Sequence, residues 1–228
     1  MSSLQFRTDR AGFPMVVIDT LDIAIHWLPL TKIQFEWFIC SQTSETFDEA
    51  WYNEVTSRNP RISPSRVSSG NYWQAFLTDI RPSEAERFAR WCGDSYSLPT
   101  LDQWLGAYEF LKTQQPVKGL IGTLEQQGLK LSERAKTLLE KLDAASEKGC
   151  KEAGYPRTLA DQMFLRRGVL EWVAVRDART QWGGMGLVNR NLHSIMINPD
   201  NGQPARPGQP ELIRMHYYGF RLIRSGLS

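Results

Sequence analysis

The chain has 228 residues, of which 41% are hydrophobic and 23% charged, and its formal net charge is +2. This length and composition predict one elaborated domain, residues 1–228, with a sizeable core. The small net charge, with acidic and basic residues interspersed, argues against a nucleic-acid partner. No apolar run reaches the roughly 18 residues of a membrane span, which argues against a membrane partner.

The N-terminus and the cysteines indicate a cellular compartment. The first residues lack the apolar stretch of a secretory signal. The three cysteines, Cys40, Cys92 and Cys150, are an odd number at wide spacings, which argues against a disulfide framework and against a zinc site. We therefore expect a cytoplasmic protein that holds no metal and no cofactor.

The first predicted elements are two short strands and a helix. Met15–Leu30 is rich in Val and Ile and alternates loosely, which predicts two strands joined near Asp19–Asp22. Thr31 and Gln34 then have the spacing of a capping box, in which each side chain satisfies the other residue's backbone N–H group. The apolar residues behind them predict a helix over about 32–40.

Residues 41–82 show little periodicity, which predicts a long, loop-rich segment held on the core by its aromatic rings. These rings are Phe47, Trp51, Tyr52, Tyr72, Trp73 and Phe76. Ser83 and Glu86 again have capping-box spacing and predict a helix over about 83–92 that ends at Gly93. Thr100 and Gln103 form a third such pair and open the helix of LDQWLGAYEFL.

The stretch from about 112 to 156 differs from the rest of the chain because it has a clear helical period. One face carries Leu131, Ala135, Leu138, Leu139, Leu142 and Ala145, with charged residues elsewhere. Ser132 is the expected N-cap and Gly149 the expected C-cap. We expect a helical insertion at the edge of a mixed domain, with its apolar face packed on the body or on a partner.

The last third contains strands and a glycine pair. LEWVAVR, from Leu170, predicts a strand, and Gly183 and Gly184 follow an aromatic residue as in a tight turn or a close backbone approach. Pro199–Pro210 is rich in turn residues. YGFRLIRS, from Tyr218, is predicted as the final strand.

Six segments, in this order, resemble the formylglycine-generating enzyme (sulfatase-modifying factor) family. They are LTKIQFEWF, EAERFARWCG, LPTLDQW, LEWV, WGGMG and the terminal GFR, between Leu30 and Arg221. The resemblance implies an α+β fold of the C-type lectin-like type, with short antiparallel strands, two main helices and much irregular loop. It also implies that the first and last strands pair, which would bring the termini close together.

The catalytic residues of that family have no counterpart in this sequence. Family members hold copper on two cysteines five residues apart after the double glycine, and those places fall at Val188 and His193. No cysteine follows Cys150. Because Cu(I) needs thiolate ligands, we expect no copper site and no oxidation of peptide cysteines. The family's Gly-Asn near its calcium is replaced by Arg167-Gly168, so no calcium site is expected either.

Two functions remain. The first is a catalytically silent binding module that recognises a protein or a small ligand through the loops after Gly184. Its expected contacts are Trp182, Arg190, Asn191, His193 and Asn198, on a surface that comprises Met185 to Pro210 together with Trp182. The diversified receptors made by bacterial retroelements share the implied fold and are a special case. The second is an enzyme of altered chemistry that uses His193, Arg190 and Asp177.

Each of these residues also has a purely structural interpretation. Trp91, Trp104 and Trp172 are expected in the core, since large rings dominate burial. Arg221 is expected to bind loop carbonyls or a carboxylate. The glycine pair can simply let the chain turn. The alternation of Leu192, Ile195 and Ile197 is also compatible with one more buried strand.

Overall fold

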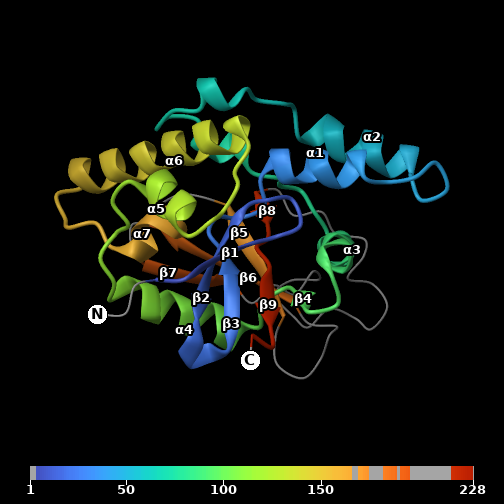
Figure 1. The fold of residues 1–228 in the computed structure, drawn as a ribbon. Helices are drawn as coiled ribbons and strands as arrows, with labels where there is room; N and C mark the ends of the chain where they lie inside the picture. Colours follow the sequence, from blue (N-terminus) through green and yellow to red (C-terminus); the bar gives the residue numbers. More distant parts are fainter. Residues whose placement is uncertain (1–3, 166–168, 175–181, 189–190, 196–216, 228) are drawn as a thin grey trace.

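The computed structural model shows an α+β arrangement of two sheets and surrounding helices (Figure 1). It describes residues 4–165, 169–174, 182–188, 191–195 and 217–227, with the backbone alone over 182–188 and 191–195. Helices α1, α2 and α6 lie along one side of the strands, and α4 lies on the other side (Figure 1). The broad α+β prediction is confirmed. Among the described residues, no helix has the length and apolar character needed to cross a membrane.

The first sheet contains the two predicted N-terminal strands. Its order is β1 (Phe6–Thr8), β2 (Pro14–Ile18), β3 (Ile23–His26), β9 (Ile223–Ser225) and β4 (Tyr96–Ser97), all antiparallel. Every residue of β2 and β3 is buried, so this part of the sheet is covered on both faces. The last strand, β9, pairs with β3 and β4 and with neither β1 nor β2, so the expected pairing of the first and last strands is wrong. Strand β1, which the sequence did not predict, lies at the edge.

The second sheet has the order β7 (Asn191–Ile195), β6 (Trp182–Val188), β5 (Leu170–Ala174) and β8 (Tyr218–Gly219). Only the β5–β8 pair is parallel. Gly183 and Gly184 lie within β6, opposite Val173 and Trp172, so the prediction of a turn at this pair is wrong. The predicted final strand is in fact two strands, β8 and β9, which belong to different sheets.

Three helices begin near the predicted capping boxes. Thr31 caps α1 (Lys32–Cys40) and Thr100 caps α4 (Leu101–Lys112), each with its predicted glutamine partner. Helix α3 (Pro82–Cys92) begins earlier than predicted. Proline favours the first helical position, so Arg81 becomes the N-cap, and its N–H donates to the Glu84 carboxylate at 2.7 Å. The predicted stop at Gly93 is confirmed.

Helix α2 (Glu49–Arg58) lies in the segment 41–82, which was predicted to be rich in loops and without this helix. The Asp48 carboxylate accepts the Trp51 N–H at 2.9 Å and caps this helix. The Trp51 ring then meets Phe38 of α1 edge-on, with ring centroids 6.2 Å apart. The predicted anchoring by aromatic rings therefore holds for Trp51 and for the buried Phe76, but Phe47 and Trp73 are exposed.

The region predicted as an insertion contains α5 (Leu120–Gln126) and α6 (Glu133–Glu152), and α7 (Leu159–Met163) follows it. Ser132 caps α6 as predicted, but the helix continues past Gly149 to its C-cap at Ala153. The leucines of α6 share one core cluster with residues of β2, β3 and α4. The apolar face therefore packs on the body of the protein itself. With seven α-helices in the described part of the chain, the expectation of two main helices is too low.

Gly219 stands where two backbone segments approach closely. A Cβ atom at this position would lie 2.6 Å from the Leu77 carbonyl oxygen, well inside van der Waals contact. We expect Gly219→Ala to lower the free energy of unfolding by about 2 kcal/mol or more, because backbone must move to relieve the overlap. Urea unfolding measures this change.

The matched control is Gly122→Ala in the interior of α5, where an added Cβ meets nothing within 4 Å. Alanine has the higher helix propensity, so this variant should be more stable than the wild type by up to about 1 kcal/mol. Equal effects of the two changes would contradict the steric explanation.

Candidate functional site

Three of the segments that carry the family resemblance meet in one buried cluster. Trp104 of LPTLDQW donates from its indole Nε1 to Glu171 Oε2 at 2.9 Å. Arg221 of GFR donates to both oxygens of Glu171, which belongs to LEWV, at 2.5 and 2.8 Å. Arg221 is fully buried and Glu171 is 1% exposed. The cluster therefore joins α4, β5 and the C-terminal segment.

Arg221 also connects the two sheets. The chain passes from β8 in the second sheet to β9 in the first at this residue, and its Nη1 donates to the His26 carbonyl of β3 at 2.9 Å. Its Nη2 donates to the Met163 carbonyl at 3.2 Å, and the guanidinium lies 4.1 Å from the Phe164 ring centroid. The structural role expected for Arg221 is confirmed. Its buried charge is stabilised by one carboxylate and two backbone carbonyls.

The tryptophans expected in the core are mostly there. Trp104 and Trp172 are buried, and Trp172 Nε1 donates to the Ile80 carbonyl at 2.6 Å. Trp91 is only half-buried: its ring packs on Phe88, and the Arg10 guanidinium lies over it at 5.0 Å. The described positions therefore give Trp104 and Trp172 a structural role.

The predicted ligand contacts fall partly within strands. Trp182 is the first residue of β6, and Asn191 and His193 lie on β7, paired with Val188 and Gly186. Residues 185–188 and 191–195 are thus paired strands and not the loop that was expected. The alternation at Leu192 and Ile195 had left a strand open as the other interpretation. Arg190, Asn198 and Asp177 lie outside the described residues.

The three cysteines differ in burial, and the thiol of Cys92 is not activated. Cys40 is exposed, Cys92 is half-buried and Cys150 is buried. Burial, followed by the nearby Asp9 charge, raises the pKa of the Cys92 thiol well above its usual range. A raised thiol pKa disfavours the thiolate that nucleophilic or metal chemistry requires.

One histidine is held in a buried polar network that the sequence did not predict. His26 Nε2 lies 3.3 Å from Asp9 Oδ2, and His26 Nδ1 accepts the Leu222 N–H at 3.4 Å. Asp9 also accepts the Gln34 amide at 2.8 Å and the Phe13 N–H at 2.8 Å. The side chains of Asp9 and His26 are both buried. Since their other partners are backbone N–H groups and the Gln34 amide, we assign the network a structural role, in which it links β1, β3 and α1.

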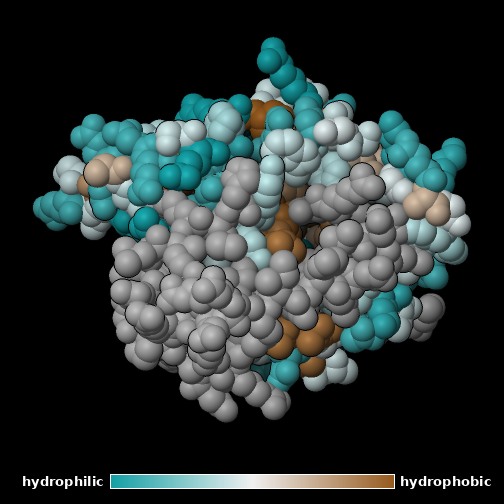
Figure 2. Space-filling model, turned by 180° about the vertical axis from the view of Figure 1, so that it is seen from behind, coloured by the Kyte–Doolittle hydropathy of each residue, from teal (hydrophilic) through white to brown (hydrophobic). Residues whose placement is uncertain are grey.

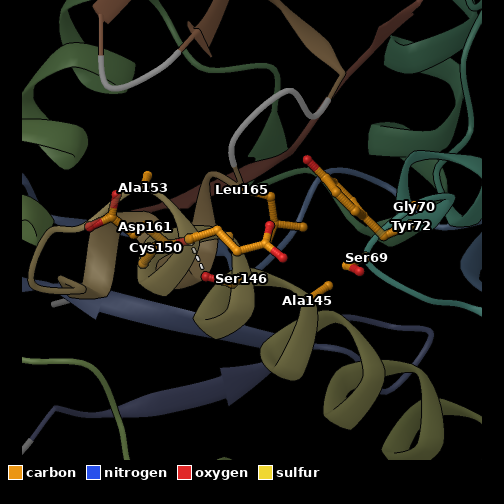
Figure 3. Close-up of a pocket in the computed structure, with 11 residues that line it drawn as sticks. Ser69, Gly70, Tyr72, Ala145, Ser146, Cys150, Ala153, Asp161 and Leu165 are labelled. Carbon is orange, nitrogen blue, oxygen red and sulfur yellow. Dashed lines mark hydrogen bonds between the residues drawn. The ribbon is translucent and has the colours of Figure 1, made fainter.

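A cavity of about 370 Å³ lies between the C-terminal half of α6, α7 and the segment around Tyr72 (Figure 3). Ser69, Gly70 and Tyr72 lie toward one end of it, and Cys150, Ala153 and Asp161 toward the other (Figure 3). Ser146 donates to the Asp161 carbonyl at 2.7 Å and accepts from Arg157 at 3.0 Å. The Asp161 carboxylate caps α7. These polar groups form hydrogen bonds within the fold, so they give little support to a catalytic role for this cavity.

Neither metal ligands nor similarity to known proteins identifies a site. Among the described residues, no group of three or more His, Cys, Asp or Glu side chains is arranged to hold a metal ion. On the face opposite that of Figure 1, the described surface near the helices at the top is mostly hydrophilic (Figure 2).

No family model, curated protein or solved structure matches the chain.

Proposed function

We propose that this protein is a catalytically silent binding module of the formylglycine-generating enzyme type, with a C-type lectin-like fold. The observation that carries the proposal is the buried cluster of Trp104, Glu171 and Arg221. These residues come from three of the six segments on which the resemblance rests. These segments are far apart in the sequence and still meet in one hydrogen-bonded cluster, which supports a scaffold shared with that family.

The positions of the cysteines support the proposal that this protein lacks the copper chemistry of that family. The positions of the two copper-binding cysteines correspond to Val188 and His193, and the sequence has no cysteine after Cys150. An aliphatic side chain gives a soft Cu(I) ion no ligand, and a single imidazole does not replace two thiolates. A purified sample incubated with Cu(I) and a cysteine-containing peptide should therefore form no aldehyde.

The proposed binding surface comprises Trp182, Arg190, Asn191, His193 and Asn198. Its support is chemical. Amide, imidazole and guanidinium groups form adaptable hydrogen bonds, and aromatic and arginine side chains are enriched at protein interfaces. The expected ligand is a protein or a small molecule, bound in the cytoplasm.

The double variant Arg190→Ala, His193→Ala tests this surface. Affinity capture from the native cell with the tagged wild type identifies the partner, and the same partner is then titrated against the variant. We expect at least tenfold weaker binding with the melting temperature unchanged, because interface arginines often contribute more than 1 kcal/mol. Glu140→Ala with Lys141→Ala, exposed on α6, is the control. Binding that survives the double change overturns the assignment.

A further inference from the structure

A second cavity, of about 460 Å³, lies between the start of α1, the end of α2 and the segment around Trp73. Its volume is in the range of pockets that hold small organic ligands. The wall carries four cationic side chains, Lys32, Arg58, Arg61 and Arg66, and a single carboxylate, that of Asp79. This excess of positive charge in a concave site is the first indication of an anionic ligand.

The acidic neighbours do not neutralise these cations. Arg58 reaches Asp79 through one contact of 3.8 Å, which leaves most of the five N–H groups of its guanidinium for other partners. Arg61 pairs with Glu36 at 3.2 Å, but Glu36 also pairs with Arg134 at 2.9 Å. Even if Asp79 and Glu36 each neutralise one cation, two positive charges remain among the described residues of the wall.

Lys32 and Arg66 have no ion pair with an acidic side chain in the described part of the chain. Lys32 Nζ donates to the Pro60 carbonyl at 2.9 Å. Burial lowers the pKa of Lys32 to about 8, since its ammonium is only partly solvated and no carboxylate among the described residues pairs with it. A bound anion would supply the missing opposite charge.

Two aromatic rings stand beside the cations. Trp73 and Tyr217 meet edge to face, with centroids 6.3 Å apart, and both line the cavity. Trp73 is 42% exposed and Tyr217 is 54% exposed. Among the tryptophans whose side chains the structure describes, all the others except Trp37 are buried or half-buried. Large exposed rings that the fold brings together from distant sequence positions are suited to stack on a planar group.

The wall of the cavity is held in place by two asparagines. The Asn59 amide donates to the Val55 and Thr78 carbonyls and accepts the Thr78 N–H, which joins the end of α2 to the segment before Asp79. Asn71 accepts the Ser68 N–H at 2.7 Å and donates to the Arg66 carbonyl at 3.1 Å. A wall that is ordered before binding lowers the entropic cost of holding a ligand.

We propose that this cavity binds a free nucleotide, that is, a phosphate ester that carries a planar base. Lys32, Arg58 and Arg66 bind the phosphates, for which guanidinium groups provide paired N–H donors. Trp73 and Tyr217 stack on the base. The assignment uses described residues alone and does not depend on the binding surface around Arg190 and His193, so the two proposals fail independently.

Calorimetric titration of the wild type with ADP, adenosine and pyrophosphate tests the ligand class. We expect ADP to bind at least tenfold more tightly than either part alone, because the charges and the rings act together. No binding of ADP at millimolar concentration overturns the proposal. So does equal affinity for adenosine or for pyrophosphate, since either result removes one half of the recognition. A short single-stranded oligonucleotide that binds far more tightly than ADP overturns it in favour of nucleic acid.

Variants then locate the site. Arg66→Ala and Trp73→Ala should each weaken ADP binding about tenfold, with melting temperatures near that of the wild type, because both side chains are exposed. Lys141→Ala, an exposed cation on α6 outside the cavity, should leave ADP binding unchanged. Unchanged affinity in both pocket variants, or an equal loss in Lys141→Ala, places the nucleotide elsewhere and overturns the proposal.

Acylation of lysines provides a second readout. With a pKa of about 8, roughly half of the Lys32 amine is neutral at pH 8, whereas almost none of an ordinary lysine is. Peptide mapping after brief acylation should show faster labelling of Lys32 than of Lys141, and saturating ADP should slow the labelling of Lys32 severalfold. Labelling of Lys32 that ADP does not change contradicts the assignment of phosphates to this side chain.

Discussion

Arg221→Met should lower the free energy of unfolding by about 3–5 kcal/mol, which is a large part of the stability of an ordinary domain. The reason is that Glu171 would remain buried with its charge uncompensated. The His26 and Met163 carbonyls would also lose a donor. Chemical unfolding followed by circular dichroism measures the effect.

Glu171→Gln and the double variant separate the charge from the packing. Glutamine keeps an acceptor for the Trp104 indole but leaves the Arg221 charge buried without its partner, so the single change should also be costly. The double variant Glu171→Gln, Arg221→Met removes both charges and should cost less than the two single changes added together. Strict additivity, or a loss under about 1 kcal/mol for Arg221→Met, would contradict the interpretation of a coupled buried pair.

The sequence predicted the local features of the structure well. The capping boxes at Thr31 and Thr100 and the N-cap at Ser132 involve residues three positions apart, so their spacing can be read directly. The buried strands β2 and β3 could also be predicted locally, because their content of Val and Ile is high. Helix α3 shows the limit of this approach. It begins at Pro82, before the predicted start at Ser83, because proline favours the first helical turn.

Long-range partners could not be predicted in this way. Trp104 and Glu171 are 67 positions apart, and no spacing rule connects Asp9 with His26. The resemblance to a known family pointed to LPTLDQW, LEWV and GFR as motifs, but not to the contact among them. The cavity near Trp73 was missed for the same reason. Its cations come from α1, α2 and the segment after α2, and Tyr217 joins them from the other end of the chain.

Leu138→Asp combined with Leu142→Asp on α6 should abolish cooperative folding. Both leucines are almost fully buried, at 2% and 1% exposure, in the cluster that includes strands β2 and β3 and helix α4. Each change removes a buried side chain, at a cost of about 2–5 kcal/mol, and also places a carboxylate in an apolar environment. Together these costs are similar to the whole stability of a domain.

The control for this change is Lys141→Asp, on the exposed face of the same helix. It adds the same side chain without removing a buried one, so its effect should be within about 0.5 kcal/mol of the wild type. Thermal unfolding and size-exclusion chromatography distinguish the outcomes. If the double variant keeps a wild-type transition and loses only a binding partner, then the leucine face of α6 is an interface. Since the leucines belong to the protein's own core cluster, we expect loss of the fold itself.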